Sequence, residues 1–128
     1  MSLKILYVDD EPFMLSAVRR LVSLDGHQLV GVNNPQDGIT AAREGQFDLI
    51  LSDMQMPEMN GVEMVKRIRA NGCTLPILFT SGGMSDRERT DMGHMLLEGV
   101  AQGFLEKPLT RASLQAAIAR LTESPPQS

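Results

Sequence analysis

The chain has 128 residues, which is enough for one domain and too few for two of usual size. Apolar residues make up 42% and charged residues 22%, the balance of a folded domain rather than a disordered chain. The net charge is -4 and the 12 basic residues are scattered, which argues against nucleic acid as a direct partner.

The cysteine content and the short N-terminal apolar run indicate the compartment in which the protein is expected. The single cysteine, Cys73, has no partner for an internal disulfide, which is typical of a reducing compartment. The apolar run at residues 5–8 is too short for a secretory signal or a membrane span. We therefore expect a soluble cytoplasmic protein without a membrane partner.

Five short apolar runs are candidates for strands, and they lie at residues 5–8, 29–32, 49–51, 77–79 and 103–105. The first, third and fourth runs are apolar at every position. This pattern is typical of strands that are buried on both faces of a parallel sheet.

Between these runs, apolar residues recur at the spacing of a helix face. The predicted stripes are Met14, Ala17, Val18, Leu21 and Val22; Ile39, Ala41 and Ala42; Val62, Val65 and Ile68; Met92, Met95, Leu96 and Val100; and Leu114, Ala117, Ile118 and Leu121. Signals for helix ends are Pro35 at a first turn, Gly72 at an end, Ser85 with Glu88 as a capping box, and Thr110 as a cap. Strictly alternating strands and helices predict an α/β fold, with a parallel sheet covered by helices on both faces.

The domain is expected to span residues 4–122, and residues 123–128, with Pro125-Pro126, are expected to form a C-terminal tail or linker.

Polar residues follow four of the predicted strands at the edge where parallel sheets bind ligands. Asp9 and Asp10 follow the first strand, Asp53 the third, Ser81 the fourth and Lys107 the fifth. Crowded carboxylates repel one another, and a hard divalent cation with oxygen ligands, such as Mg²⁺, relieves that repulsion. An ionised aspartate can attack phosphorus and form an acyl phosphate, while an ammonium and a hydroxyl stabilise the transferring group.

Four separated motifs then carry a family resemblance. They are Asp9-Asp10, the run from Asp53 to Gly61 (DMQMPEMNG), Thr80-Ser81-Gly82 and Lys107-Pro108. With these motifs in this order, the chain resembles the receiver domain of two-component response regulators from about Lys4 to Leu121. The resemblance implies a flavodoxin-like (βα)5 fold, doubly wound, with five parallel strands in the order 2-1-3-4-5.

The resemblance also implies a role for each matching residue. Asp53 matches the phosphorylated aspartate, Asp10 a direct Mg²⁺ ligand, and Asp9 an aspartate that acts on the metal through water. Gln55 matches the position whose backbone carbonyl binds the metal. Lys107 matches the lysine that pairs with a phosphoryl oxygen, and its peptide bond to Pro108 is often cis in this family.

The expected output is a conformational switch rather than turnover chemistry, although such domains catalyse their own phosphotransfer and dephosphorylation. Ser81 matches the switch hydroxyl, with Thr80 one residue too early, and Phe104 matches the aromatic switch position. The implied donor is a histidine kinase or a phosphotransfer protein. The implied reader, an output domain or a downstream protein, binds the face formed by the fourth helix, fifth strand and fifth helix, and the phosphorylated form can dimerise.

Two features depart from the family pattern. The segment from Ser81 to Lys107 is a few residues longer than usual, which is expected to extend or distort the fourth helix. Gly83 stands where a larger side chain is common, and we hypothesise that it gives water better access to the phosphoryl group.

Other interpretations of the same residues are open at this stage. An aspartyl-phosphate hydrolase needs a second acid two residues after its nucleophile, and Gln55 occupies that position. A flavin or nucleotide site needs free N–H groups after the first strand, where Asp9-Asp10 would repel phosphate. A receiver-like module without phosphorylation would lack some of the acidic residues or Lys107. Individually, Asp9-Asp10 could begin a helix, and Phe104 could belong to the core.

Overall fold

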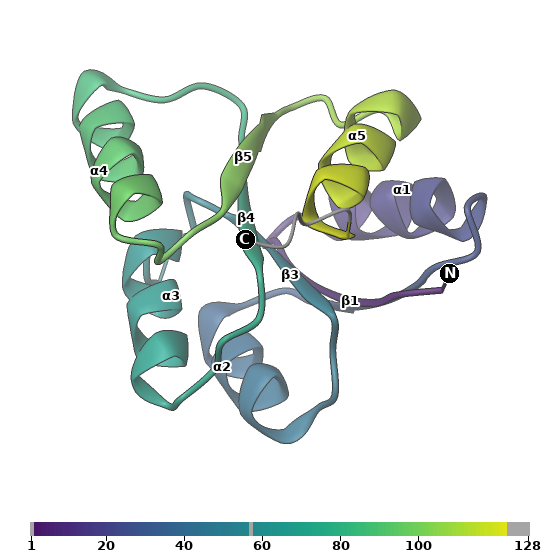
Figure 1. Ribbon diagram of the computed structural model, residues 1–128, viewed down its shortest axis with the longest axis horizontal. Helices are drawn as coiled ribbons and strands as arrows, with labels where there is room; N and C mark the ends of the chain where they lie inside the picture. Colours follow the sequence, from purple (N-terminus) through teal and green to yellow (C-terminus); the bar gives the residue numbers. More distant parts are fainter. Residues whose placement is uncertain (1, 57, 123–128) are drawn as a thin grey trace, which may run out of the picture.

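The computed structural model describes residues 2–56 and 58–122, in which five strands alternate with five helices (Figure 1). In chain order these are β1 (Lys4–Val8), α1 (Pro12–Ser23), β2 (Gln28–Val32), α2 (Pro35–Glu44), β3 (Leu49–Asp53), α3 (Gly61–Ala70), β4 (Ile77–Ser81), α4 (Asp86–Leu97), β5 (Gly103–Glu106) and α5 (Arg111–Thr122). The predicted tail and Pro57 of the second motif lie outside the described residues.

The five strands form one parallel sheet in the order β2-β1-β3-β4-β5, which confirms the flavodoxin-like topology. The central register pairs Val8 of β1 with Val32 of β2 and with Ser52 of β3. In the next pair, Asp53 of β3 lies opposite Thr80 of β4. The register therefore brings the ends of β1, β3 and β4 to the same edge of the sheet.

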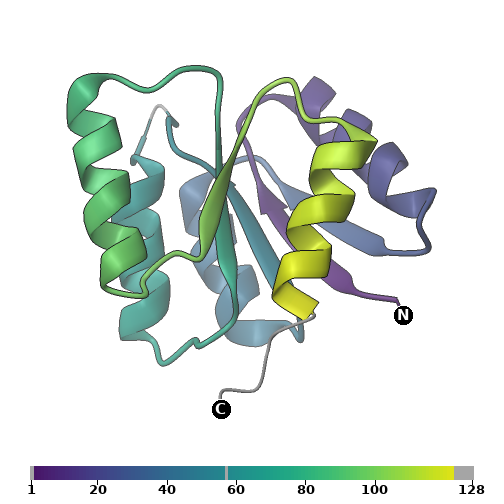
Figure 2. The same cartoon turned by 45° about the horizontal axis from the view of Figure 1, so that its top comes forward.

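Helices cover both faces of the sheet: α1 and α5 pack on one face, and α2, α3 and α4 on the other (Figures 1 and 2). Alternate residues of a strand point to opposite faces, so each central strand contributes to both cores. Examples on the α1–α5 side are Ile5, Tyr7 and Leu51, and on the other side Leu6 and Ile50. Strands buried in this way need apolar residues at every position, as the sequence has.

The predicted helix ends are largely confirmed. Ser85 and Glu88 form a complete capping box at the start of α4, and Asn34 caps α2 before Pro35. Thr110 Oγ1 accepts a hydrogen bond from the Ser113 N–H at 3.0 Å, as expected of a helix cap.

The fourth helix differs from its prediction in one respect. Met92 and Met95 are buried, but Leu96 is 39% exposed and Val100 lies beyond the last residue of α4, Leu97. The buried side of α4 is narrower than its apolar stripe, because this helix packs beside the edge strand β5. The long segment between β4 and β5 does not break the helix, which is continuous over 12 residues.

A single arginine connects three segments at the edge of the sheet opposite the acidic residues. The Arg69 guanidinium, from the last turn of α3, donates to the carbonyls of Cys73, Leu75 and Val100 at 2.7–3.0 Å. It also donates to Gln102 Oε1 at 3.1 Å. Burial lowers the pKa of Arg69, but the guanidinium remains charged and its hydrogen bonds are charge-assisted.

We expect Arg69→Ala to lower the free energy of unfolding by roughly 2–3 kcal/mol, because several partly buried carbonyls lose their donor. Arg67→Ala is the matched control on the same helix. Arg67 forms an exposed ion pair with Glu63 at 3.1 Å, and such pairs contribute less than about 1 kcal/mol. Urea unfolding of both variants measures the difference, and equal losses would contradict this account of Arg69.

Candidate functional site

The predicted site residues meet at the carboxyl ends of the strands. Asp53 and Ser81 are the last residues of β3 and β4, and Asp9 and Lys107 directly follow β1 and β5. Asp9, Asp10 and Asp53 each place a carboxylate oxygen within 4.8 Å of the others. The Lys107 N–H donates to the Ser81 carbonyl at 2.8 Å, which fixes the lysine beside this edge.

Lys107 is the cation of the acidic cluster. Its Nζ lies 3.1 Å from Asp9 Oδ2 and 3.6 Å from Asp53 Oδ2. Burial alone would lower the pKa of Lys107, but the hydrogen bond to Asp9 and the charges of Asp53 and Asp9 outweigh burial and raise it. The lysine is therefore charged at neutral pH and stands between the two carboxylates.

Asp53 is the member of the cluster whose ionised form is disfavoured by its surroundings. Burial raises its pKa, the charge of Lys107 lowers it, and the charges of Asp9 and Asp10 raise it again, for a final value of about 6. Its side chain is only slightly exposed, and its two nearest donors, Lys107 and the Gln55 N–H, lie at 3.6 and 3.4 Å. Asp53 is thus a weakly satisfied carboxylate.

An open cleft of about 320 Å³ leads to this carboxylate. The residues that line the cleft are Asp10, Glu11, Asp53, Gln55, Gly82 and Lys107. Asp9 is fully buried, and its Oδ1 accepts a hydrogen bond from the Glu11 N–H at 2.9 Å. Asp9 therefore also shapes the turn into α1, although it does not cap the helix: Glu11 is the N-cap residue and its side chain makes no cap hydrogen bond.

The backbone of α3 begins directly against the end of β3. The Gly61 N–H donates to the Met54 carbonyl at 2.8 Å, and a β-carbon at position 61 would clash with the Asp53 carbonyl. Glycine at this position allows the chain to pass close behind Asp53.

Gln55 makes a contact that the sequence did not predict. Its side-chain amide donates to both carboxylate oxygens of Glu88, at 3.1 and 2.9 Å. Glu88 also closes the capping box of α4 with Ser85. The loop after Asp53 is therefore tied to the first turn of α4.

The two predicted switch residues occupy different environments. Ser81 is buried, and its Oγ accepts a hydrogen bond from the Gly83 N–H at 3.1 Å. Phe104 is 40% exposed on β5, beside a groove that β5 forms with α5. Thr80 is fully buried, with no hydrogen-bond partner for its hydroxyl in the described part of the chain.

Tyr7 is the polar group of the site that the sequence interpretation missed. Its hydroxyl donates to Asp9 Oδ2 at 2.7 Å, and both side chains are fully buried. A signal was present, because a tyrosine in a strand covered on both faces needs a partner for its hydroxyl. Asp9 is two residues further along and lies on the same side.

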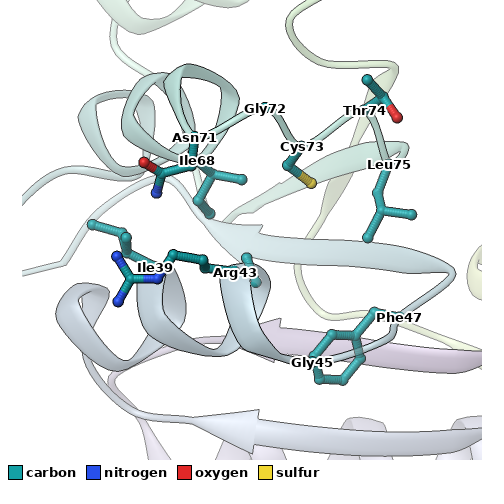
Figure 3. A pocket seen from close by; sticks show the side chains of 11 residues that line it. Ile39, Arg43, Gly45, Phe47, Ile68, Asn71, Gly72, Cys73, Thr74 and Leu75 are labelled. Atoms are coloured by element: carbon teal, nitrogen blue, oxygen red, sulfur yellow. The ribbon is translucent and has the colours of Figure 1, made fainter.

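A second pocket, of about 290 Å³, lies at the opposite edge of the sheet, between the ends of α2 and α3 (Figure 3). Cys73, Phe47 and Arg43 are among its lining residues. It contains no carboxylate, so it lacks the chemistry of the acidic cleft.

Comparison with known proteins identifies the family. The model of the response regulator receiver domain family matches residues 5–119. The chain belongs to this family. The receiver domain is a signalling module of two-component systems, and its acidic pocket binds Mg²⁺. No helix in the described parts of the chain has the length and apolar character needed to cross a bilayer.

Relatives of this receiver domain differ in overall length. The chemotaxis protein CheY-3 of Vibrio cholerae is 32% identical over 130 residues, which cover 95% of this chain and 93% of that protein. The sensor protein GacS of Pseudomonas syringae is 31% identical over 125 residues, which cover 93% of this chain but only 13% of GacS. The chain likewise spans 12% of the sensor kinase RcsC of Salmonella typhi, at 29% identity.

Solved structures share the fold. The receiver domain of the sensor histidine kinase PA1611 from Pseudomonas aeruginosa, described with a magnesium ion in its active site cleft, has a TM-score of 0.82. It is 25% identical and covers 97% of this chain and 100% of that one. A CheY-like receiver domain from Methanospirillum hungatei has a TM-score of 0.84 at 20% identity and covers 96% and 95% of the two chains.

The raised pKa of Asp53 predicts a pH-dependent cost to stability in metal-free protein. Because this pKa is about 6 in the folded chain and ordinarily 3.8, folded protein binds more protons between these values. Stability contributed by this group is therefore lost as pH rises from about 4 to about 6. We expect Asp53→Asn to raise the free energy of unfolding above about pH 7 by roughly 1–2 kcal/mol, with no gain below about pH 4.

Urea unfolding in the presence of a chelator measures this effect. Excess Mg²⁺ provides the control, because a bound cation stabilises the wild-type carboxylate cluster more than the variant. A metal-free variant that is less stable than wild type above pH 7 would contradict the assigned electrostatics.

Proposed function

We propose that this receiver domain accepts a phosphoryl group onto Asp53 from a histidine kinase or a phosphotransfer protein in the cytoplasm, and then changes conformation to signal to an output partner. The observation that carries the proposal is the weakly satisfied Asp53 carboxylate, which faces an open cleft with Lys107 Nζ 3.6 Å away and two further carboxylates beside it. We infer that the domain is a phosphoacceptor switch rather than a turnover enzyme.

The acidic cluster fits a magnesium ion by its chemistry. Its three carboxylates offer only hard oxygen ligands and carry more negative charge than Lys107 neutralises. We propose Asp10, Asp53 and the backbone carbonyl of Gln55 as ligands, with Asp9 acting through water. When bound, the metal supplies positive charge that reduces repulsion between Asp53 and an incoming phosphoryl group.

The transfer step needs little from the protein beyond position and charge. An Asp53 carboxylate oxygen forms a bond to phosphorus while the bond from phosphorus to the donor's imidazole nitrogen breaks, and that nitrogen keeps the electron pair. Lys107 shifts toward a phosphoryl oxygen, which its present place near Asp53 Oδ2 allows. Burial of the acceptor keeps bulk water from most of its surface.

The proposed response of the fold begins at Ser81. Ser81 Oγ now accepts a hydrogen bond from the Gly83 N–H at 3.1 Å, and its own proton can be donated to a phosphoryl oxygen. We propose that the hydroxyl turns toward the phosphoryl group and that its contact with the Gly83 N–H is loosened. This rearranges the start of the β4–α4 loop, and Phe104 then moves from its half-exposed position toward the space that is vacated. The surface formed by α4, β5 and α5 changes shape, and we propose that a downstream protein or an output domain reads it. The phosphorylated form can also dimerise through that surface.

The proposal does not depend on whether the receiver acts alone or within a larger protein. Its relatives include CheY-3, nearly all of which this chain spans, and GacS, of which it spans 13%. Both settings need the same acceptor chemistry and differ in the partner that reads the switch.

A hydrolase acting on small phosphate esters is the main rival. Such an enzyme needs a general acid at position 55 to protonate its leaving group. Gln55 has no acidic proton to transfer, and its amide N–H groups donate to the Glu88 carboxylate. A nucleotide or flavin site is disfavoured because Asp10 and Glu11 line the cleft where a phosphate would lie.

Incubation with Mg²⁺ and acetyl phosphate tests the proposed function. We expect intact mass to show one added phosphoryl group per chain and no labelling of Asp53→Asn. Asp48→Asn is the matched control, because Asp48 directly precedes the same strand at its other end and should leave labelling intact. Many turnovers of a simple phosphate ester would favour the hydrolase, and an unlabelled wild-type protein would indicate a receiver that no longer phosphorylates.

Gly83 is expected to set the lifetime of the phosphorylated form. A β-carbon at this exposed position would meet no atom within 4 Å, so substitution is sterically tolerated and the Gly83 N–H is retained. We expect Gly83→Glu to slow hydrolysis of the phosphoryl group several-fold by excluding water, and Gly83→Ala to have a smaller effect. Decay of the labelled protein after donor removal gives both rates, and unchanged decay in Gly83→Glu would refute the shielding role.

A further inference from the structure

The hydroxyl of Tyr7 is a fully buried polar group of the site and has no part in the proposed phosphotransfer. Tyr7 lies in β1, fully buried in the core on the α1–α5 side together with Ile5 and Leu51. Its ring lies in the apolar core, and its hydroxyl donates to Asp9 Oδ2 of the acidic cluster at 2.7 Å. This is the length of a strong hydrogen bond to an ionised carboxylate.

The Asp9 carboxylate is held by three donors at once. Tyr7 and Lys107 both donate to Oδ2, at 2.7 and 3.1 Å, and the Glu11 N–H donates to Oδ1 at 2.9 Å. Two donors on Oδ2 occupy the two lone pairs of that oxygen, whereas Oδ1 has one lone pair left. The carboxylate is therefore fixed in orientation, with Oδ1 as its remaining acceptor.

We propose that Tyr7 is a positioning residue for the metal site: through its hydrogen bond it holds Asp9 in the orientation that binds a hydrated divalent cation. Tyr7 itself contacts neither metal nor phosphoryl group. The inference rests on the proposed metal site, but it concerns cation affinity and not transfer chemistry. Outer hydrogen bonds of this kind typically change metal affinity by about 10–100-fold.

The phenol is suited to this role because it remains a donor. A phenol has an ordinary pKa of about 10, so its hydroxyl holds its proton at neutral pH. Lys107 cannot substitute for it, because Lys107 is shared with Asp53. When Lys107 moves toward a phosphoryl oxygen, Tyr7 is the side-chain donor that stays on Asp9.

Tyr7→Phe removes the hydroxyl and keeps the ring. We expect Mg²⁺ affinity, measured by calorimetry on the metal-free protein, to fall about tenfold. The Mg²⁺ concentration that gives half-maximal labelling by acetyl phosphate should rise equally, while the labelling rate at saturating Mg²⁺ changes little. Loss of a metal-positioning contact changes both the Mg²⁺ affinity and the Mg²⁺ concentration for half-maximal labelling. A loss of folding stability alone changes neither of them.

Ile5→Val is the matched control for core packing. Ile5 lies two residues before Tyr7, on the same side of the same strand, and is fully buried. The variant loses one buried methylene and should unfold at lower urea, with Mg²⁺ affinity unchanged. If Tyr7→Phe behaves like Ile5→Val, the hydroxyl is only a satisfied core group and the proposal is overturned.

A second measurement needs no substitution at Tyr7. The chain has one tyrosine and no tryptophan, so emission excited at wavelengths that its four phenylalanines do not absorb comes from Tyr7. We expect this emission to change as Mg²⁺ binds, with the same midpoint as the calorimetric titration. The reason is that the positive charge of the cation alters the Asp9 carboxylate to which the phenol donates its hydrogen bond. Constant emission across that titration would overturn the proposal even if Tyr7→Phe failed to fold.

The outcomes also separate this inference from the proposed function. If wild type binds Mg²⁺ but is not labelled, phosphotransfer fails and the Tyr7 titrations still decide the inference. If wild type is labelled normally and Tyr7→Phe binds Mg²⁺ with unchanged affinity, the proposed function stands and the role of Tyr7 is refuted.

Discussion

Three carboxylates gathered around one ammonium are the constraint on which the rest of this site depends. Asp9, Asp10 and Asp53 place oxygens within 4.8 Å of one another, and the ammonium of Lys107 contacts Asp9 and Asp53. In a poorly solvated cleft, like charges at such distances repel strongly. The hydrogen-bonded sheet fixes the ends of β1 and β3. The three carboxylates therefore cannot relieve their repulsion by moving away from one another. Burial is the largest cause of the raised pKa of Asp53, and the charges of Asp9 and Asp10 add to it.

Hydrogen bonds beside Asp53 connect this charged cluster to the start of α4. Gln55 stands two residues after Asp53, and its amide holds Glu88 in the first turn of α4. Ser81, at the end of β4, holds the loop that leads into the same helix through the Gly83 N–H. A change in charge at Asp53 therefore acts next to two contacts that both determine how α4 begins. Electrostatics at the sheet edge and packing of α4 are connected through a short set of hydrogen bonds.

Most of the fold was predictable because its signals are local. Runs that are apolar at every position specify buried parallel strands, and caps such as Ser85 with Glu88 mark helix starts. The site was predictable from topology, since residues that follow parallel strands must meet at one edge. Leu96 was wrongly placed in the core because periodicity gives the direction of a helix face and not how far its neighbours cover it.

Contacts between segments distant in sequence were the part that the sequence could not supply. The pairing of Gln55 with Glu88 joins residues 33 positions apart, and nothing in either local pattern implies the other. The unequal sharing of Lys107 between Asp9 and Asp53 depends on tenths of an ångström in the packed structure. Tyr7 is different, because both the need of a buried phenol for a partner and the side on which Asp9 lies follow from the sequence.

The distribution of buried polar groups explains how one small domain tolerates such a site. Among the described residues, the buried side chains that are polar or charged are Asp9, Ser52, Asp53, Thr80 and Ser81. All five lie at the carboxyl ends of β1, β3 and β4, where the hydroxyl of Tyr7 also contacts Asp9, and the other members of both buried cores are apolar. The desolvation of fully buried polar side chains is thus concentrated at this edge, whereas the apolar cores on both faces of the sheet supply the hydrophobic stabilisation. Because the apolar strands hold that edge in place, its charges can change without unfolding the domain, which is the property that a phosphorylation switch requires.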